Sequence, residues 1–163
     1  MIEEIIKNLN KGKQMLILLP IENYCDKSLP PYYSSIGGHT RHVLDMFNCI
    51  FSGFPSGIVD LRKRVRDVDV ELYPVVATEY FDRMIEQLLK LKASDLNTEI
   101  DLVDDLGSGS CMVKTTLGAV LAQAQSHTTH HYSTIGYLLC NLGVHIKDHT
   151  FGLNPTTPQT SQG

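Results

Sequence analysis

Residues 117–142 read LGAVLAQAQSHTTHHYSTIGYLLCNL and form the longest stretch of the chain with helical periodicity. Thr115 or Thr116 can cap its start, and Gly143 follows its end as a typical helix stop. One set of residues recurs at helical spacing throughout the stretch and forms a single stripe: Leu117, Val120, Leu121, Ala124, Thr128, Ile135, Leu138 and Leu142. The pattern predicts one long helix with one buried face.

Three histidines lie in the middle of this helix, and the spacing sorts them by face. At ~100° per residue, His131 falls near the middle of the stripe, His127 at its margin and His130 on the opposite side. Two histidines at positions i and i+4 project from one face and can reach a single cation at ~2.0–2.1 Å. The spacing therefore indicates an inward pair, His127 and His131, and an outward His130.

The rest of the chain supplies three more long helices and a pair of strands. Helical periodicity predicts helices over about 2–18, from Ser34 or Ser35 to just before Gly53, and over about 69–92 with Pro74 in the first turns. Residues 97–114 alternate and contain a Gly-Ser-Gly turn, which predicts a short hairpin. We expect an all-α, antiparallel four-helix bundle with a small β-hairpin between the third and fourth helices, as one domain over 1–163 with a loosely ordered tail from about 153.

Charge and hydropathy exclude several kinds of partner. The net charge of the 163 residues is −4, and no basic face is evident, which argues against tight binding to nucleic acid. The longest apolar stretch, residues 15–19, is far shorter than the ~20 residues that span a bilayer. The N-terminus lacks the pattern of a signal peptide, so we expect a cytoplasmic protein without a membrane partner. The basic run over 62–66 is interpreted as a solvated face with local ion pairs.

A second pair of histidines lies on the second helix. Spacing places His39 at the centre of that helix's apolar stripe and His42 at its edge, so periodicity slightly favours His39 as the inward residue. Two inward pairs on different helices are hard to explain as core packing, because each buried imidazole must be neutral and hydrogen-bonded. A metal ion held by three histidines keeps open coordination positions, which is typical of a catalytic site rather than a closed structural one.

Four blocks of the chain carry a resemblance to a known family. They are SIGGHTRHVLD over 35–45, VDLRKRVRD over 59–67, HTTHHY over 127–132 and FGLNPTTP over 151–158. Together they resemble blocks of the DinB/YfiT-like superfamily, and more narrowly its uncharacterised bacterial DinB family branch, over about residues 1–158. The resemblance implies a four-helix bundle whose divalent metal is held by one histidine of the second helix and a HxxxH pair of the fourth.

Carried over to this sequence, those ligands are His42, His127 and His131. Spacing and resemblance differ on the second helix, and we follow the resemblance for His42; His39 then lies behind a ligand or faces a cofactor or substrate. The metal would be Zn, Ni, Fe or Mn, with Cu also compatible with histidine ligands. The spacing places no carboxylate with confidence beside the metal as a general base, because Asp45 falls off the edge of the stripe.

The resemblance implies two alternative functions. The first is a metal-dependent enzyme that performs hydrolysis or thiol-dependent transfer on a small molecule, with that molecule or a thiol as partner. The second is a non-catalytic, stress-associated bundle that binds a metal or a small ligand. Family habit suggests a homodimer, and the family name suggests induction by DNA damage, which is distinct from DNA binding.

Overall fold

The computed structural model describes residues 1–17 and 19–158. Within these residues the chain is mostly helical, with six α-helices, two 3-10 turns and a three-stranded sheet. In chain order the elements are α1 (Ile2–Ile17), α2 (Ile21–Cys25), α3 (Ile36–Gly53), η1 (Phe54–Ser56), β1 (Ile58–Asp60), α4 (Val68–Leu72), α5 (Pro74–Lys90), η2 (Ala93–Asn97), β2 (Glu99–Asp105), β3 (Ser110–Thr116) and α6 (Leu117–Asn141). The prediction of a mainly helical protein is confirmed, whereas the short helix α4 was not foreseen as a separate element.

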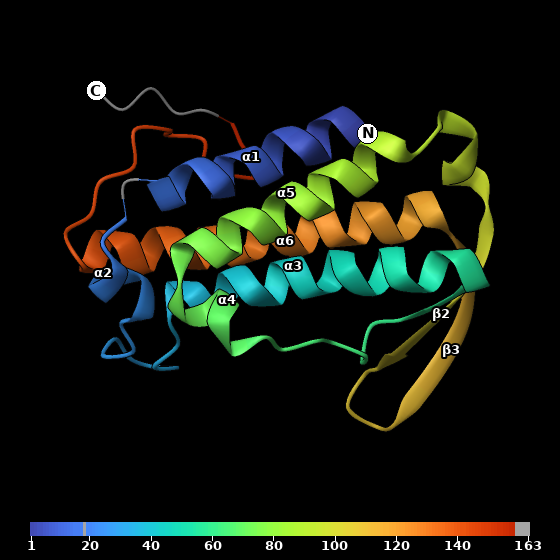
Figure 1. The fold of residues 1–163 in the computed structure, drawn as a ribbon, viewed down its shortest axis with the longest axis horizontal. Helices are drawn as coiled ribbons and strands as arrows, with labels where there is room; N and C mark the ends of the chain where they lie inside the picture. Colours follow the sequence, from blue (N-terminus) through green and yellow to red (C-terminus); the bar gives the residue numbers. More distant parts are fainter. Residues whose placement is uncertain (18, 159–163) are drawn as a thin grey trace.

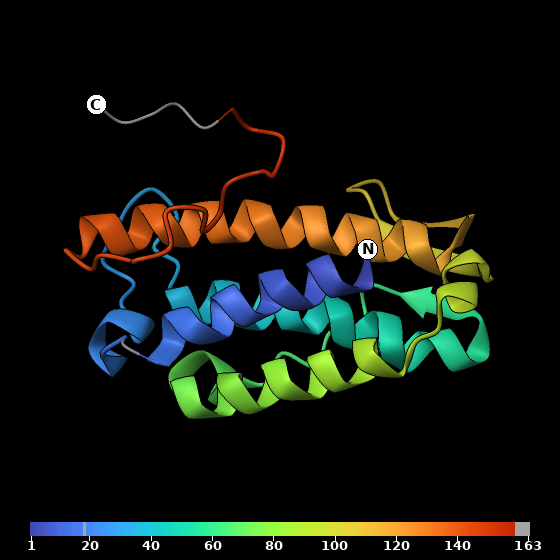
Figure 2. The same ribbon diagram turned by 90° about the horizontal axis from the view of Figure 1, so that it is seen from above.

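The four long helices α1, α3, α5 and α6 lie side by side (Figure 1). Helix α3 packs against α5 and α6, and α1 packs against the same two helices (Figure 2). Helices α3 and α6 run antiparallel, as do α1 and α5, but α3 and α5 run in the same direction. This differs from the expected all-antiparallel arrangement, because the connection over residues 54–73 returns along the length of the helices before α5 begins.

The third long helix is shorter than predicted. Instead of one helix over about 69–92, α4 ends at Leu72 and α5 begins at Pro74, with Tyr73 extended at φ −123° and ψ 109°. The ring of a proline disfavours the helical region for the residue before it, so Tyr73 interrupts the helix and Pro74 starts the next one.

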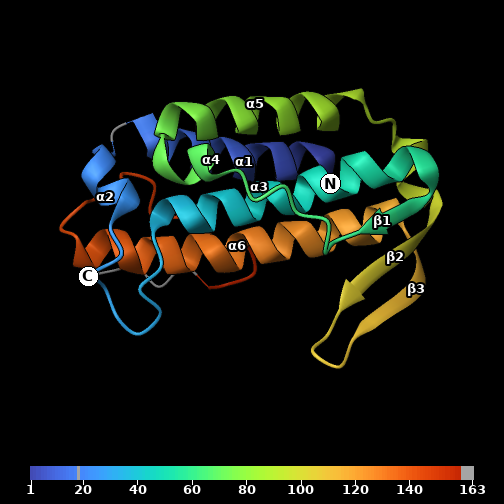
Figure 3. The same ribbon diagram turned by 60° about the horizontal axis from the view of Figure 1, so that its bottom comes forward.

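The sheet lies at one end of the helices. Strands β2 and β3 pair antiparallel where the sequence predicts a hairpin, and this hairpin extends away from the helices (Figure 3). A third strand, β1, pairs parallel with β2 through Val59 and Leu102 and was not foreseen. Strand β1 is only three residues long, so its sequence is too short to show the alternation of apolar and polar residues that predicts a strand. The side chain of Val59 is buried in the core.

Two glycines allow neighbouring segments to approach α1 and α3. A Cβ on Gly12 would lie 2.0 Å from the Tyr132 hydroxyl, and one on Gly37 would lie 2.1 Å from the carbonyl oxygen of Glu71. Gly37 therefore permits the close approach of the α4 backbone. These contacts join α1 to α6 and α3 to α4.

The segment after α6 packs back on the helices before the chain leaves the described region. The ring of Phe151 stacks on Tyr132 with centroids 4.6 Å apart. Position 18, at the expected end of the first helix, and positions 159–163 of the expected loose tail lie outside the described residues. Among the helices that are described, none combines the length and apolarity that crossing a membrane requires.

Candidate metal centre

Helices α3 and α6 each begin at a side-chain cap. The start of each helix fixes the face on which its histidines lie. The Ser35 hydroxyl accepts from the backbone N–H of Gly38 at 3.0 Å, and the Thr116 hydroxyl accepts from that of Ala119 at 3.2 Å. Such caps satisfy N–H groups that the first helical turn leaves free. The packing of α3 against α6 then turns the histidine faces of the two helices toward each other.

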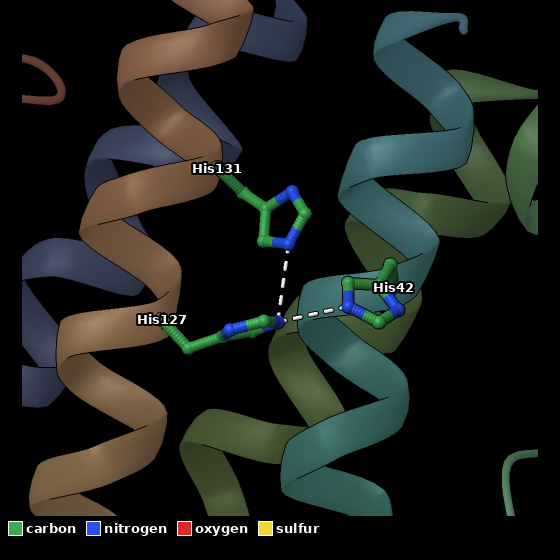
Figure 4. Close-up of side chains that lie close together, drawn as sticks. All are labelled: His42, His127 and His131. Atoms are coloured by element: carbon green, nitrogen blue, oxygen red, sulfur yellow. Dashed lines mark hydrogen bonds between the residues drawn. The ribbon is translucent and has the colours of Figure 1, made fainter. Parts of the chain in front are cut away.

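Three histidines meet between these helices. The Nε2 atom of His127 lies 2.8 Å from Nε2 of His42 and 3.1 Å from Nε2 of His131 (Figure 4). All three ligand atoms lie within 4.8 Å of one another, and each side chain is half-buried. The structure thus brings together the three residues that the family resemblance selected.

Burial keeps these imidazoles neutral. It lowers the pKa of His131 to about 3, with further lowering by His127 and His42. It also lowers the pKa of His42 to about 4, with Arg64 as the next contribution. The pKa of His127 is lowered as well, mainly by burial. Neutral imidazole is the form that binds a metal ion, so these residues are in that form near pH 7.

The set fits a divalent cation. Two nitrogens that share a tetrahedral cation at ~2.0–2.1 Å lie ~3.3 Å apart, which is close to the 2.8 Å and 3.1 Å separations observed here. His127 accounts for both short contacts, since its Nε2 faces two other Nε2 atoms. Three neutral nitrogen donors suit Zn, Ni, Fe or Cu better than the oxygen-preferring Mg or Ca.

His39 lies behind His131 rather than in the set. Its Nδ1 is 2.8 Å from Nδ1 of His131, and its Nε2 is 2.8 Å from the Ser34 hydroxyl. Metal-binding histidines commonly use their second ring nitrogen for such a contact, which orients the ring. Spacing alone had slightly favoured His39 over His42; tertiary packing brings Nε2 of His42, at the stripe edge, to His127 instead.

His130 is exposed, as its position on the opposite side of the helix predicted. Its ring centroid lies 5.3 Å from that of His131 and 6.4 Å from that of His127, so it neighbours the cluster without joining the converging Nε2 atoms.

The sequence interpretation missed Arg64. Arg62 does form a local ion pair, with Nε 2.9 Å from Asp60, as the solvated-face interpretation expected. Arg64 instead turns inward, and its Nη1 lies 3.2 Å from Nδ1 of His42. No local pattern distinguishes the two arginines; only the course of the segment after β1, along the outside of α3, does so.

Asp45 is held in a buried network away from the three ligand atoms. It is fully buried, with one oxygen 2.7 Å from Nη1 of Arg41 and the other 3.2 Å from the Tyr80 hydroxyl. Arg41 also pairs with Glu71 at 2.6 Å. Cys49 is buried in the core, and this burial raises the pKa of its thiol to about 11. Neither Asp45 nor Cys49 joins the described ligand cluster.

Comparisons with known proteins support the fold. No protein-family model matches the sequence, and no curated protein matches it either. The structure is similar to the crystal structure of a DinB-like protein, YjoA, from Bacillus subtilis, with a TM-score of 0.64 and 20% sequence identity. The match covers 88% of this chain and 94% of that chain. At this identity the likeness concerns the fold, and we conclude that this chain has the DinB-like fold that its four sequence blocks predicted.

Proposed function

We propose that this protein binds a divalent metal ion through His42, His127 and His131 and uses it in an enzymatic reaction on a small molecule. The observation that carries the proposal is the convergence of three half-buried Nε2 atoms from two helices. The DinB-like fold fits a metal-binding protein of this kind. The proposal includes membership of the DinB/YfiT-like superfamily. It also includes a single domain in which the four long helices form one bundle.

A bound cation with open positions would polarise a carbonyl or activate a water or a thiol. The reaction class is therefore hydrolysis or thiol-dependent transfer. The protein's own part is to keep the Nε2 atoms of the three rings directed at one point. Helix α6 supplies two of them one turn apart, and α3 supplies the third, with His39 and Ser34 orienting the ring of His131.

The partners we propose are a small-molecule substrate or a thiol, with a homodimer as the assembly. We expect no specific binding to nucleic acid, because the net charge is −4. A gel-shift titration at physiological salt tests this point, and nanomolar binding would contradict it.

A second candidate is a metal- or small-ligand-binding protein without catalysis. One observation favours it: Asp45, the carboxylate one turn beyond His42, is buried against Arg41 and Tyr80 and does not face the three ligand atoms. A hydrolase of this kind would need another general base, or a metal-bound hydroxide acting alone.

The deciding experiment is elemental analysis of protein purified without a nickel column. One transition-metal ion per chain in the wild type, lost in the triple variant H42A/H127A/H131A, supports the metal centre. The matched variant H130A changes a histidine of the same helix that lies outside the cluster and should retain the metal. A wild type that takes up no transition metal on reconstitution would defeat the metal centre and the enzymatic proposal that depends on it, and would leave only small-ligand binding.

A further inference from the structure

Arg64 is a charged side chain that lies beside the histidine cluster. It is half-buried, its Nε donates to the carbonyl oxygen of Leu61 at 3.2 Å, and its Nη1 lies 3.2 Å from Nδ1 of His42. Arg62 pairs with Asp60 through two nitrogens, each at 2.9 Å. Within the described residues no ion pair forms on Arg64, so its positive charge faces the site without a counter-ion.

The contact between Arg64 and His42 requires one form of the imidazole ring. A guanidinium group donates hydrogen bonds and cannot accept them, so Nδ1 of His42 must be the acceptor. The ring proton of neutral His42 then lies on Nε2, the atom that faces His127. Binding of a metal by that Nε2 requires the proton on Nδ1, where it would point at another donor. The contact with Arg64 and metal binding through Nε2 therefore exclude each other.

The other side of the cluster has no such conflict. Nδ1 of His131 faces Nδ1 of His39, and Nε2 of His39 faces the Ser34 hydroxyl. Each of these groups can donate or accept, so the direction of every hydrogen bond along the chain can reverse without moving a ring. Among these neighbours of the histidines, Arg64 is the one that must give way when a cation binds.

A released guanidinium at this position suits an anionic ligand. The three ligands are neutral, so they leave the charge of a divalent cation uncompensated, and Arg64 adds a further positive charge nearby. The planar fork of arginine matches a carboxylate, with two parallel N–H donors.

We propose that metal binding releases Arg64 from His42 and that the free guanidinium then binds the carboxylate of a small molecule at the metal centre. The inference rests on the proposed metal site and narrows its ligand to carboxylate-bearing compounds. The inference predicts that Arg64 lowers the affinity of the protein for the metal ion and raises the affinity of the metal-loaded protein for a carboxylate.

The test uses the full chain in four forms: wild type, R64M, R64K and R62M. Methionine keeps the unbranched apolar part of the side chain without the charged guanidinium, and Arg62 is the neighbouring arginine that pairs with Asp60. Calorimetric titration with Co²⁺ measures metal affinity, and the visible absorption of the Co²⁺-loaded protein reports added acetate. Acetamide, which has the same shape without the charge, is the ligand control. Circular dichroism checks that each variant is folded.

R64M should bind Co²⁺ about three- to tenfold more tightly, because a positive charge and a competing hydrogen bond are removed. Its acetate affinity should fall about tenfold or more, because a charge-assisted pair is lost. R64K should lie between wild type and R64M in acetate affinity, since it keeps the charge without the fork. R62M should match the wild type in both affinities.

Three results would overturn the inference. The first is an acetate affinity of R64M equal to that of the wild type. The second is a fall of both the Co²⁺ affinity and the acetate affinity in R64M, which would make Arg64 a support for His42. The third is a wild type that binds acetate no better than acetamide. A wild type that binds no Co²⁺ defeats the proposed metal site itself, and this outcome is visible in the first titration, before any anion is added.

Discussion

His39 and His131 are 92 residues apart in the chain, and their Nδ1 atoms lie 2.8 Å from each other. The contact crosses from α3 to α6 and leaves Nε2 of His131 directed at His127. Because Ser34 holds the other nitrogen of His39, the ring of His131 is fixed from behind by two successive hydrogen bonds.

Replacement of His39 by alanine should weaken metal binding without abolishing it. Loss of a residue that orients a ligand typically reduces affinity about 10–100-fold. Calorimetry with Zn²⁺ measures the change, and S34A should cause a smaller loss in the same assay because it acts one hydrogen bond further away. If H39A abolished binding while H42A did not, His39 would be the ligand of α3, as helical spacing had slightly favoured.

Replacement of His127 by alanine should reduce metal affinity by one to several orders of magnitude. His127 is in contact with both other ligand atoms, and the two remaining imidazoles do not form a chelating pair on one helix. Competition with a chromophoric chelator measures the loss. H130A is the matched control, and an equal loss in H130A would show that the cluster is not the binding site.

Stability of the metal-free protein should decrease as the pH falls from about 7 to about 4. Burial lowers the pKa values of His42 and His131 to about 4 and about 3, below the ordinary value of 6.5. Between these values the unfolded chain binds more protons than the folded one, so acid favours unfolding. Urea unfolding of the wild type and of H42Q/H131Q at pH 7.5 and 5 measures this. The double variant should lose less stability on acidification; an equal loss would assign the pH dependence to other groups.

Gly12→Ala should destabilise the fold by about 1–3 kcal/mol, as overpacking of a core does. The new Cβ would meet the Tyr132 hydroxyl and, at 2.8 Å, the ring of Phe81. Gly136 on α6 is the control, because a Cβ there meets nothing within 4 Å. G136A should stabilise the helix by up to about 1 kcal/mol. Thermal and urea unfolding compare the two, and a stable G12A would mean that the helices α1 and α6 pack less closely than described.

Asp45→Asn should destabilise the protein by about 3–5 kcal/mol and leave metal affinity unchanged. The substitution removes the buried charge that pairs with Arg41, and the loss of one partner from a buried pair is costly. The exposed pair between Lys7 and Glu4 is the comparison, since solvent screens it and K7A should change stability far less than D45N does. A change in metal affinity in D45N beyond that of K7A would place Asp45 in the site.

Much of this protein follows from periodicity and local chemistry. The stripe on residues 117–142 predicts α6 and places His127 and His131 on its inner face, because side chains one turn apart share a face whatever the helix packs against. Caps at Ser35 and Thr116 and the stop at Gly143 are local as well. These features depend on neighbours within about one helical turn.

Contacts between distant segments were decided only by the tertiary structure. The path of residues 54–73 makes α3 and α5 run in the same direction, adds β1 to the sheet and turns Arg64 toward His42. Periodicity could not choose between His39 and His42, because both lie near one face of α3. The position of α6 made that choice: it brought His127 to Nε2 of His42 and left His39 against the far side of His131. Spacing along one helix determines a face, but which residue on that face meets a partner depends on how the two helices are placed against each other.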